Sequence, residues 1–445
     1  MTTKNTASIK AAEFRKRRTR LMKTIGKGAA VILPAAGIQT RNNDAEHAFR
    51  QDSHFHYLTG FNEPDAVVVL VPGRKQGEFI LFCRDRDPAM ELWTGKRAGL
   101  DGAVSDFGAD EACEIDDIDE ELPALLEGVR TVHFPIGQDA AFDHRLFSWV
   151  NTLRQQNRRG KQAPVEFVDL GLTLNEMRLF KSRAEISMMR QAARISAEAH
   201  RQAMRHTRSG MMEYEIQAET EYWFRKAGCV PSYGTIVGGG ENACVLHYVD
   251  NNCELKDGDL LLMDAGAEYG LYAADITRTW PVSGRFTEAQ KALYEVVLKA
   301  QLAAIRQVRP GKPWSAAHKA AVRVITGGLV ELGLLKGQVD ALIKKEAYKK
   351  FYMHGTGHWL GMDVHDVGQY KRDDKWRILE PGMVLTVEPG LYIAANTPGV
   401  AKKWWNTGIR IEDDIVVTAE GCEVLSKDIV KDIESIESLV GSAYK

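Results

Sequence analysis

The chain has 445 residues, of which 44% are hydrophobic and 27% charged, and its formal net charge at pH 7 is −2. These values are ordinary for a globular protein and exclude disordered and fibrous classes. A nearly neutral chain has no general attraction to phosphate backbones or anionic lipids, so neither nucleic acid nor a membrane is expected as a partner. The length exceeds what one hydrophobic core usually supports, so two or three domains are expected.

The first residues are basic but lack the apolar core of a signal peptide, and the six cysteines show no metal-knuckle or CxxC spacing. We therefore expect the protein to stay in the cytosol, where thiols are kept reduced. Apolar residues that alternate with Arg and Lys predict an amphipathic helix near 8–24 with a solvated basic face. The strand-like runs GAAVILPA, AVVVLVP, GEFILFC and TVHFPIG, with a helix around ELPALLEGV, follow and predict a mixed α/β domain.

A polar, basic stretch, NRRGKQAPVEF, precedes the first long helical pattern. We place the domain boundary near 175, giving an N-terminal domain over 1–175 and a C-terminal domain over 176–445. In the second domain, the apolar periodicity predicts long helices over 184–206, 213–227, 287–308 and 314–334. Short β runs alternate with these helices, which predicts a sheet covered by helices.

Two carboxylates, Asp264 and Asp275, occupy apolar surroundings in LLLMDAGAEYGLYAADITRTWPV. If Tyr269 and Gly270 form a two-residue hairpin loop, Asp264 lies opposite Asp275, and opposed Cα atoms are about 4.5–5.5 Å apart. Two half-buried carboxylates at that distance repel and raise one pKa strongly unless a cation lies between them. The alternative is that one Asp caps a turn and the other pairs with a base such as Arg278.

Three histidines, His354, His358 and His365, lie in the glycine-rich segment FYMHGTGHWLGMDVHDVGQY. The spacing of the first two matches a zincin helix, but no Glu follows His354 and the intervening glycines disfavour a helix, so we reject a zincin site. The glycines indicate a loop that brings imidazoles and main chain close to a ligand. A single histidine is more often structural, but three in one segment favour a functional site.

Two further carboxylates follow strand-like runs. MVLTVEPGLYI predicts a strand that ends at Glu388, and GIRIEDDIVVT predicts a second strand with Glu412 and Arg410 on one face. We expect the neighbouring Asp413 and Asp414 to be solvated or salt-bridged turn residues. Four carboxylates and one imidazole make an oxygen-rich ligand set for two divalent ions, and their charges balance to leave a bound hydroxide as the nucleophile.

These motifs resemble those of the creatinase-like or "pita-bread" metallopeptidases and, among them, the bacterial Xaa-Pro aminopeptidases. The resemblance covers the whole chain, through RNNDAEHAFRQDSHFHYLTGFNEPDAVVVL, ELWTGKRAG, NEMRLFKS, PSYGTIVGGGENACVLHY, HGTGHWLGMDVHDVG, VEPGLY and GIRIEDD. It implies a two-domain α/β protein, with an N-terminal α/β creatinase-like domain and a C-terminal α+β pita-bread catalytic domain. It also implies release of the N-terminal residue from peptides with proline in second position, usually with two manganese ions.

The resemblance assigns a metal-binding role to five residues. Asp264 would bind one ion, and His358 and Glu388 would bind the other. Asp275 and Glu412 would bridge the two ions.

Further roles follow from the same resemblance. His247 and His354 would steady the scissile carbonyl and the tetrahedral species, and Glu388 would carry a proton from the water to the proline nitrogen. His365, Arg410 and Tyr392 would shape the pocket for the proline ring. The residue implied to contact the N-terminal residue of the substrate is Tyr233.

The first domain contributes no metal ligand in this scheme. In tetrameric family members this domain builds subunit contacts, and neighbouring subunits reach the mouth of the active site. We therefore expect a homotetramer, with a dimer as the alternative. Trp93 would be a residue at that rim, and the competing interpretation is a buried packing side chain.

Other activities use related sequences. A prolidase, which cleaves Xaa-Pro dipeptides, has the same ligands but tends to carry a longer insertion between its two metal glutamates than separates Glu388 from Glu412. Methionine aminopeptidases normally lack so large a first domain. Metal-free peptide-binding relatives and creatinase lack the complete acidic set.

Overall fold

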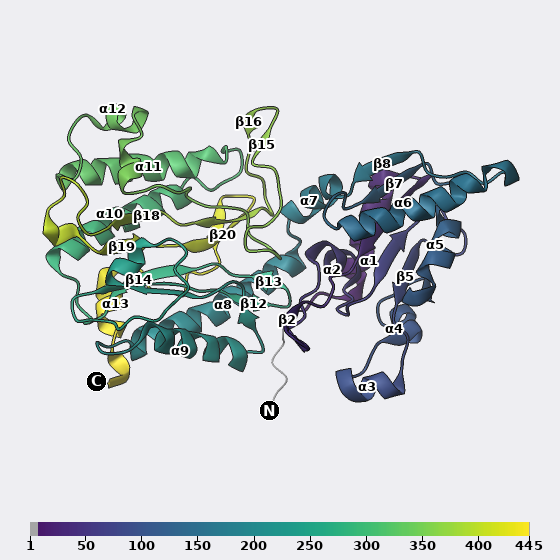
Figure 1. Ribbon diagram of the computed structural model, residues 1–445. Helices are drawn as coiled ribbons and strands as arrows, with labels where there is room; N and C mark the ends of the chain where they lie inside the picture. Colours follow the sequence, from purple (N-terminus) through teal and green to yellow (C-terminus); the bar gives the residue numbers. More distant parts are fainter. Residues whose placement is uncertain (1–7, 445) are drawn as a thin grey trace. The chain divides into compact units, whose positions relative to one another are not determined.

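Residues 8–444 are described by the computed structural model of the protein. The chain divides into two compact units, Ile9–Met177 and Arg178–Lys445, called here the N-terminal and C-terminal units (Figure 1). The sequence placed the boundary near 175, and the contacts place it after Met177. Within the described residues, no helix combines the length and apolar character needed to cross a lipid bilayer.

A six-stranded mixed sheet forms the centre of the N-terminal unit. Its strands are β1 (Ala29–Pro34), β4 (Val67–Leu70), β5 (Phe79–Cys83), β6 (Glu111–Glu114), β7 (Thr131–Phe134) and β8 (Glu166–Asp169). Their order is β6-β5-β4-β1-β7-β8, antiparallel within β1, β4 and β5 and parallel toward both edges. A separate short pair joins β2 (Thr40–Asn42) to β3 (Ala45–Glu46).

Most helices of this unit lie against the sheet, and the helix Pro88–Thr94 stands apart from it (Figure 1). The helices are α1 (Ala11–Ile25), α2 (Ser53–Thr59), α3 (Pro88–Thr94), α4 (Gly99–Ser105), α5 (Ile118–Leu126), α6 (Ala140–Gln155) and α7 (Gly171–Leu179). The apolar side chains of α5 and α6 pack on the buried Val, Ile and Phe residues of the strands and form one core. The N-terminal unit therefore has the mixed α/β character expected from its strand-like runs.

Helix α1 departs from the expected solvated basic face. Arg17 and Arg18 are buried, and their guanidinium groups donate to the carbonyl oxygens of Tyr57 and Leu58, at 3.1 and 2.8 Å. Those carbonyls belong to the last turn of α2, where carbonyls lack helical partners and the helix dipole favours a cation. Arg18 also stacks over the Phe79 ring. The expectation was wrong for these two residues because their partners are distant in sequence.

Four long helices enclose the strands of the C-terminal unit: α8 (Arg183–His206), α9 (Glu213–Lys226), α10 (Glu288–Ile305) and α11 (Ser315–Glu331). Each lies within a few residues of its expected range. Capping boxes fix two of the starts, with Ser182 and Glu185 before α8 and Thr287 and Gln290 before α10. In Figure 1 the strands lie between an α8–α9 layer and an α10–α11 layer. Two short helices, α12 (Val339–Lys344) and α13 (Ile433–Leu439), complete the unit.

Short antiparallel sheets form the β layer of this unit. One contains β10 (Ile236–Gly239), β11 (Leu260–Asp264) and β14 (Thr277–Pro281), and a second contains β9 (Val230–Pro231), β12 (Ala267–Tyr269) and β13 (Tyr272–Ala273). A third contains β17 (Val384–Val387), β20 (Asp413–Val417) and β21 (Cys422–Val424). The remaining pairs are β18 (Gly390–Ile393) with β19 (Thr407–Arg410) and β15 (Lys371–Arg372) with β16 (Lys375–Trp376).

The hairpin that carries the first two acids has a different register from the expected one. Tyr269 pairs with Tyr272, so the two-residue loop is Gly270 and Leu271, both with positive φ (55° and 65°). Positive φ at both loop positions is typical of a type I′ turn, whose twist suits a hairpin. The expected loop, Tyr269-Gly270, was therefore wrong, because the observed loop begins one residue later. A leucine with positive φ is unfavourable, and nothing in the sequence indicates that Leu271 adopts this conformation.

The strand predicted from GIRIEDDIVVT is also divided. It forms two strands with different partners, β19 beside β18 and β20 beside β17, joined through Ile411 and Glu412. The change of partner at Glu412 turns this carboxylate away from both ladders. It is therefore available to the site described next.

Candidate metal centre

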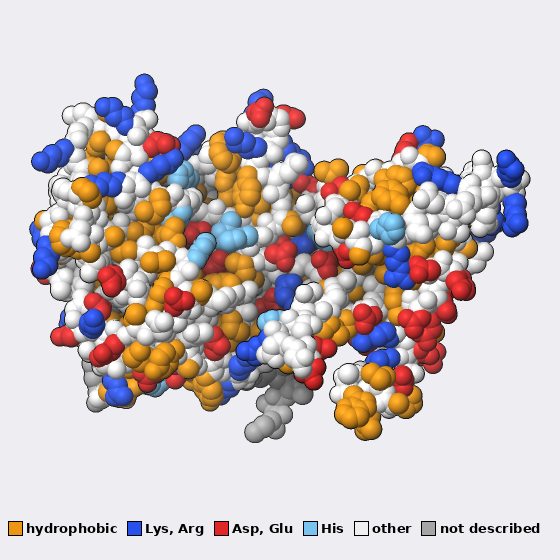
Figure 2. Space-filling model, viewed as in Figure 1, with side chains coloured by type: hydrophobic (Ala, Val, Ile, Leu, Met, Phe, Trp, Pro, Cys, Tyr) orange, Lys and Arg blue, Asp and Glu red, His pale blue; other side chains and the backbone are white. Residues whose placement is uncertain are grey.

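A pocket of about 290 Å³ in the C-terminal unit brings the predicted ligands together. Figure 2 shows histidine and acidic side chains gathered near the middle of the visible face of this unit. The lining contains all five predicted metal ligands, three further predicted histidines and Arg410. The lining residues are Leu246, His247, Asp264, Asp275, His354, Gly355, Gly357, His358, His365, Glu388, Arg410 and Glu412.

Asp264 and Asp275 reach this pocket as diagonal neighbours. Asp264 pairs with Thr277 rather than with Asp275, so the directly opposed pair expected from the sequence is wrong. Asp275 precedes Thr277 by two residues and points to the same side, and diagonal positions in an antiparallel ladder are still within reach of each other. The two carboxylates therefore share one pocket despite the changed register.

Three ligand atoms form the tightest group. Asp275, His358 and Glu412 each offer one atom within 4.8 Å of the others. His358 Nε2 lies 3.2 Å from Asp275 Oδ2, and His358 Nδ1 lies 2.9 Å from the carbonyl oxygen of Trp359. A carbonyl on one ring nitrogen fixes the imidazole orientation and leaves the other nitrogen for a ligand, an arrangement common in metal-binding histidines.

Without a cation, the ionised forms of the buried carboxyl groups in this pocket are destabilised, which raises the pKa of several of them. Burial, followed by the charges of Asp275 and Glu388, raises the pKa of Glu412 well above its usual value. Burial also raises the pKa of Asp264, although Arg410 partly opposes this, and it raises the pKa of Glu388 to about 7. Bound divalent ions would remove these penalties, and carboxylate oxygens with one imidazole are donors that such ions accept. The residues present therefore fit a divalent metal centre.

His358 and Asp275 behave as an ion pair. Burial lowers the pKa of His358, but the hydrogen bond and charge of Asp275 outweigh burial and raise it to about 9. Burial likewise raises the pKa of Asp275, and the hydrogen bond and charge of His358 outweigh this and lower it. In the ion-free protein, protonated His358 therefore neutralises part of the negative charge of the acids. A bound divalent ion would neutralise more of it.

A hydrogen-bonded arm joins Arg410 to His354. Arg410 donates to Asp264 Oδ2 at 2.6 Å and to the Tyr392 hydroxyl at 3.1 Å, and that hydroxyl lies 2.9 Å from His354 Nε2. Burial, followed by the charge of Arg410, lowers the pKa of His354 to about 4. His354 is therefore a neutral imidazole at physiological pH. Tyr392 lies behind the pocket and reaches it through these two neighbours.

His247 and His365 stand at the exposed side of the pocket. The His365 ring meets the His358 ring edge-to-face, with centroids 4.3 Å apart. Burial and the charge of His358 lower the pKa of His365, which favours its neutral form. Both histidines can therefore meet a ligand that enters from solvent.

Two buried threonines support the ligands and were missed by sequence reasoning. Thr277 Oγ1 donates to Glu412 Oε2 at 2.6 Å and accepts from Arg410 Nε at 3.1 Å. Thr386 Oγ1 accepts from the backbone N–H of His358 at 3.1 Å. Thr277 and Thr386 each lie two residues from a predicted acid in an extended segment, so the parity that related Arg410 to Glu412 could have found both.

The motif NEMRLFKS supplies a second support. Arg178 donates to Asp363 Oδ2 at 2.7 Å and to Asp366 Oδ1 at 2.5 Å, and Lys181 donates to Asp366 Oδ2 at 2.8 Å. Asp366 is nearly inaccessible, and its backbone N–H donates to the carbonyl of Trp359. These contacts close the loop that carries His365. The sequence showed the motif but no function for it.

Asp413 and Asp414 are not turn residues. Both are buried in β20, where Asp413 pairs with Arg278 at 2.7 Å and with Lys431 at 2.5 Å. Asp414 accepts from the backbone N–H of Asp275 at 3.3 Å. The expectation of salt bridging was right for Asp413, but the expected turn was wrong. Arg278 is thereby committed to Asp413, which excludes it as the partner of Asp264 or Asp275.

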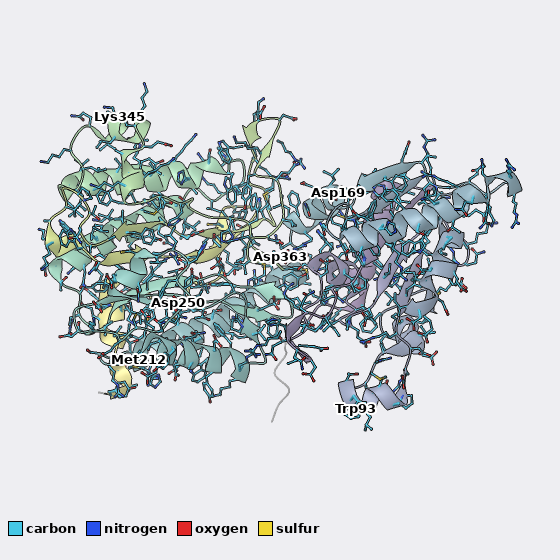
Figure 3. The ribbon with its side chains drawn as sticks, viewed as in Figure 1. Trp93, Asp169, Met212, Asp250, Lys345 and Asp363 are labelled. Atoms are coloured by element: carbon cyan, nitrogen blue, oxygen red, sulfur yellow. The ribbon has the colours of Figure 1, made fainter. Side chains whose placement is uncertain are left out.

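Besides Tyr392, two predicted substrate-contact residues, Tyr233 and Trp93, lie outside the lining of the pocket. The Tyr233 hydroxyl donates to Asp264 Oδ1, and burial raises the pKa of Tyr233 well above its usual value. Trp93 is 83% exposed in the chain and lies in α3, at the outer tip of the N-terminal unit (Figure 3). The interpretation of Trp93 as a buried packing residue is therefore wrong.

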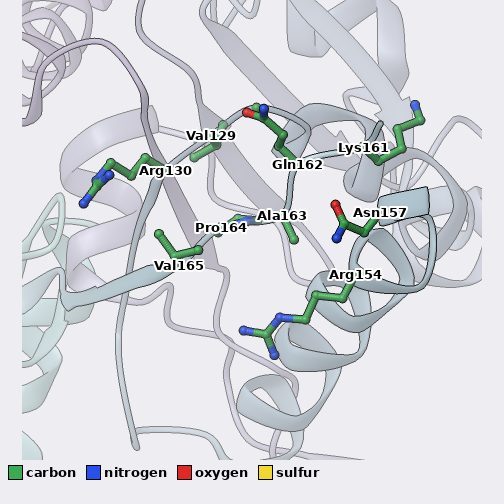
Figure 4. Close-up of a pocket in the computed structure, with 10 residues that line it drawn as sticks. Val129, Arg130, Arg154, Asn157, Lys161, Gln162, Ala163, Pro164 and Val165 are labelled. Carbon is green, nitrogen blue, oxygen red and sulfur yellow. The ribbon is translucent and has the colours of Figure 1, made fainter. Parts of the chain in front are cut away.

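A larger pocket, of about 590 Å³, lies in the N-terminal unit and contains the basic side chains of Arg130, Arg154 and Lys161. Arg130 is paired with Glu166, and Lys161 is paired with Glu127. In Figure 4 the side chains of Arg130 and Arg154 extend toward the left of the view and that of Lys161 toward the right, with their charged ends well apart. They do not converge on a common ligand, and the pocket lacks the clustered acids and imidazoles of the first one.

Comparison with known proteins identifies the family. The family model described as metallopeptidase family M24 matches residues 187–419, and that of the aminopeptidase P N-terminal domain matches residues 14–133. The Xaa-Pro aminopeptidase of Escherichia coli is 46% identical, covering 99% of this chain and 100% of that protein, and the Haemophilus influenzae one is 44% identical over 98% of each. The structure of Pseudomonas aeruginosa aminopeptidase PepP matches with 54% identity and a TM-score of 0.98, covering 99% of this chain and 100% of that one. The chain therefore belongs to metallopeptidase family M24, among the Xaa-Pro aminopeptidases, with the two-domain α/β and pita-bread architecture that its motifs implied.

Proposed function

We propose that this chain releases the N-terminal residue from peptides whose second residue is proline, by means of a dinuclear metal centre. The observation that carries the proposal is the convergence of four carboxylates and His358 in one pocket. Relatives that match nearly the full length of the chain are named Xaa-Pro aminopeptidases, which supports the substrate class.

Five residues would hold two divalent ions, and manganese is our choice because the donor set is rich in hard oxygen ligands. They are Asp264, Asp275, His358, Glu388 and Glu412. When bound, the ions would polarise the scissile carbonyl and supply hydroxide at neutral pH. One relative was studied as zinc-substituted E. coli aminopeptidase P in complex with product, so the test includes more than one metal.

Glu388 moves the proton. Burial raises its pKa to about 7 in the ion-free pocket, which supports a role in proton transfer near neutral pH. It takes a proton from the attacking water and passes it to the proline nitrogen, which cannot leave as an amide anion. Glu388 directly follows β17, and its backbone N–H donates to the carbonyl of Thr356, so the carboxylate is held at a rigid strand end.

Two imidazoles would steady the scissile carbonyl group. His354 would act on the carbonyl oxygen as negative charge develops there, and His247 would assist from the exposed side. In the free protein the N–H of neutral His354 is on Nδ1 and donates to the carbonyl oxygen of Gly355, so the substrate oxygen would have to replace Gly355 as the acceptor. Arg410 and Tyr392 hold His354 in place, and together with His365 they shape the site for the proline ring. Tyr233, hydrogen-bonded to Asp264, contacts the N-terminal residue of the substrate.

The test compares a dipeptide, Ala-Pro, with a tripeptide, Ala-Pro-Ala, after treatment with chelator and after addition of manganese, cobalt or zinc. We expect tripeptide cleavage that requires a divalent ion and is highest with manganese. Turnover of the dipeptide alone would establish the alternative, a prolidase, which the relatives do not favour. An Asp275→Asn variant should lose both activity and bound metal, and full activity without metal would refute the proposed centre.

We further propose that the protein is a homotetramer in the cytosol. Leu92 and Trp93, in α3, are 84% and 83% exposed, which is unusual for two adjacent large apolar side chains and suits a subunit contact. All six cysteines are free, which suits a reducing compartment. Light scattering should give the mass of four chains for the wild type and a smaller mass for Trp93→Ala. A wild-type mass of two chains would establish the dimer instead.

A further inference from the structure

A second pocket, of about 310 Å³, adjoins the candidate metal centre. The two pockets share Gly355 and Gly357, the glycines that flank Thr356 between His354 and His358. Gly355 is exposed, and a Cβ atom built on it would meet nothing closer than 3.9 Å, so the main chain leaves open space here. The two pockets therefore adjoin at Gly355, where the main chain is open, whereas a Cβ atom on Gly357 would clash with the carbonyl oxygen of Thr386.

The second pocket has an apolar, aromatic wall. Trp314, Ala317, Trp376 and Leu385 supply its side chains. The Trp314 ring packs against that of Trp359, with centroids 4.2 Å apart, so this part of the wall is held in place. Volumes of this size with aromatic linings are typical of sites that bury one compact apolar group.

The two threonine hydroxyls that line this pocket have partners, whereas Ser315 Oγ, which also lines it, is buried and has no hydrogen-bond partner among the described residues. The Thr356 hydroxyl is hydrogen-bonded to His318 Nδ1 at 2.8 Å and to the Tyr352 hydroxyl at 2.5 Å. Thr386 Oγ1 accepts from the backbone N–H of His358. An apolar occupant therefore costs the two threonines no hydrogen bond, and Ser315 Oγ is unpaired with or without such an occupant.

Two features assign the pocket to the part of the peptide that follows the scissile bond. Thr386 lines it and lies 3.4 Å from Glu388 Oε1, the group that serves the leaving proline nitrogen. One cation stands beside the pocket, because Lys371 Nζ lies 4.8 Å from the centre of the Trp376 ring, and the described lining itself contains no carboxylate. A cation at this position disfavours the charged amino terminus of a substrate and suits the direction of its carboxyl terminus.

We propose that this pocket binds the side chain of the substrate residue that follows proline, and that it selects large apolar residues at this third position. The inference rests on the proposed aminopeptidase activity and deepens it by naming a feature of the substrate beyond proline.

The first experiment needs only the wild-type, manganese-loaded enzyme. It measures kcat/KM for the tetrapeptides Ala-Pro-Gly-Ala, Ala-Pro-Leu-Ala and Ala-Pro-Phe-Ala. Burying a leucine side chain predicts a preference for the Leu peptide over the Gly peptide of at least about tenfold. A ratio near one would overturn the inference while leaving the proposed function intact. Cleavage of none of the three peptides would overturn both.

The second experiment fills the pocket. Ala317→Leu places a larger side chain in the wall, and the ratio between the Leu and Gly peptides should fall toward one. Ala320→Leu, on the same helix but outside the lining, is the matched control and should keep the wild-type ratio. The inference would be overturned if Ala317→Leu kept the wild-type ratio between the Leu and Gly peptides. It would also be overturned if this variant changed kcat/KM ratios only among peptides that differ at their first residue.

A third measurement remains valid if Ala317→Leu fails to fold. The dipeptides Pro-Leu and Pro-Gly are the corresponding products and should compete with substrate in the wild-type enzyme. We expect Pro-Leu to inhibit at a concentration at least about tenfold lower than Pro-Gly does. Equal inhibition by the two dipeptides would overturn the inference.

Discussion

The Glu388→Gln variant tests two effects separately. One is the loss of folding stability caused by ionisation of the buried carboxyl group, and the other is the contribution of this carboxylate to ion binding. Burial, with the charge of Asp275 nearby, raises the pKa of Glu388 from 4.5 to about 7 in the ion-free protein. Because the folded pKa is the higher one, the stability linked to this group is fully present below pH 4.5 and is lost as the pH rises through 7. At about 1.36 kcal/mol per pKa unit, the ion-free wild type loses about 3 kcal/mol by pH 8. Glutamine carries no charge and avoids this loss.

The assay is thermal unfolding in the presence of a chelator. At pH 8 the Glu388→Gln protein should melt roughly 6 °C above the wild type, whereas at pH 5 the two free energies of unfolding should differ by less than about 1 kcal/mol. Added manganese should reverse the order, because the variant has lost a ligand and gains less from the ion. Glu380→Gln, at an exposed position, is the control and should match the wild type throughout. A variant that melts at or below the wild-type temperature in chelator at pH 8 would refute the electrostatic reasoning.

The other predictions concern the imidazoles and the support of the His365 loop. His354→Ala should lower kcat by about 10²–10³-fold and leave the metal content unchanged, as measured by steady-state kinetics and metal analysis. The control His144→Ala, at an exposed position, should change neither quantity. Loss of metal in His354→Ala would contradict the role assigned to His354. Asp366→Ala leaves buried Lys181 without its carboxylate and Arg178 with Asp363 alone, and it should cost about 3–5 kcal/mol in chemical denaturation. Asp340→Asn, at an exposed ion pair, should cost about 0–1 kcal/mol, and similar costs for the two variants would show that the buried cluster is unimportant. Since the pKa of His358 is about 9 without metal, manganese binding at pH 7.5 should release about one proton or more, detected by calorimetry in buffers of different ionisation enthalpy. Heats that are independent of the buffer would exclude this exchange.

The helices of the C-terminal unit were predictable because their information is local. Apolar periodicity located α8 to α11, and the capping boxes at Ser182 and Thr287 mark two of their starts. The membership of the acidic pocket was also predictable in outline, since parity along extended segments and the incompatibility of acids with apolar surroundings are visible in the chain.

Strand register and buried pairing were not predictable in the same way. The hairpin turns at Gly270 and Leu271, and a leucine with positive φ is tolerated only because the surrounding structure imposes it. Asp413 was assigned to a turn because its partners, Arg278 and Lys431, are remote or unmarked in the sequence. Diagonal rather than direct opposition of Asp264 and Asp275 still delivered both to the pocket. The prediction that the two aspartates share a pocket was therefore correct although the predicted register was wrong, because both registers place them on the same face of the hairpin.

The pocket draws its ligands from segments that are far apart along the chain. Asp264 ends β11, His358 lies in a glycine-rich loop, and Glu412 links β19 to β20. Two ions held by these residues, with Glu412 shared between them, would cross-link long stretches of polypeptide, and closing such stretches has a conformational entropy cost that grows only slowly with their length. Catalysis and stability would then depend on the same few carboxylate oxygens. Loss of the ions would weaken the contacts between segments that are far apart in the sequence.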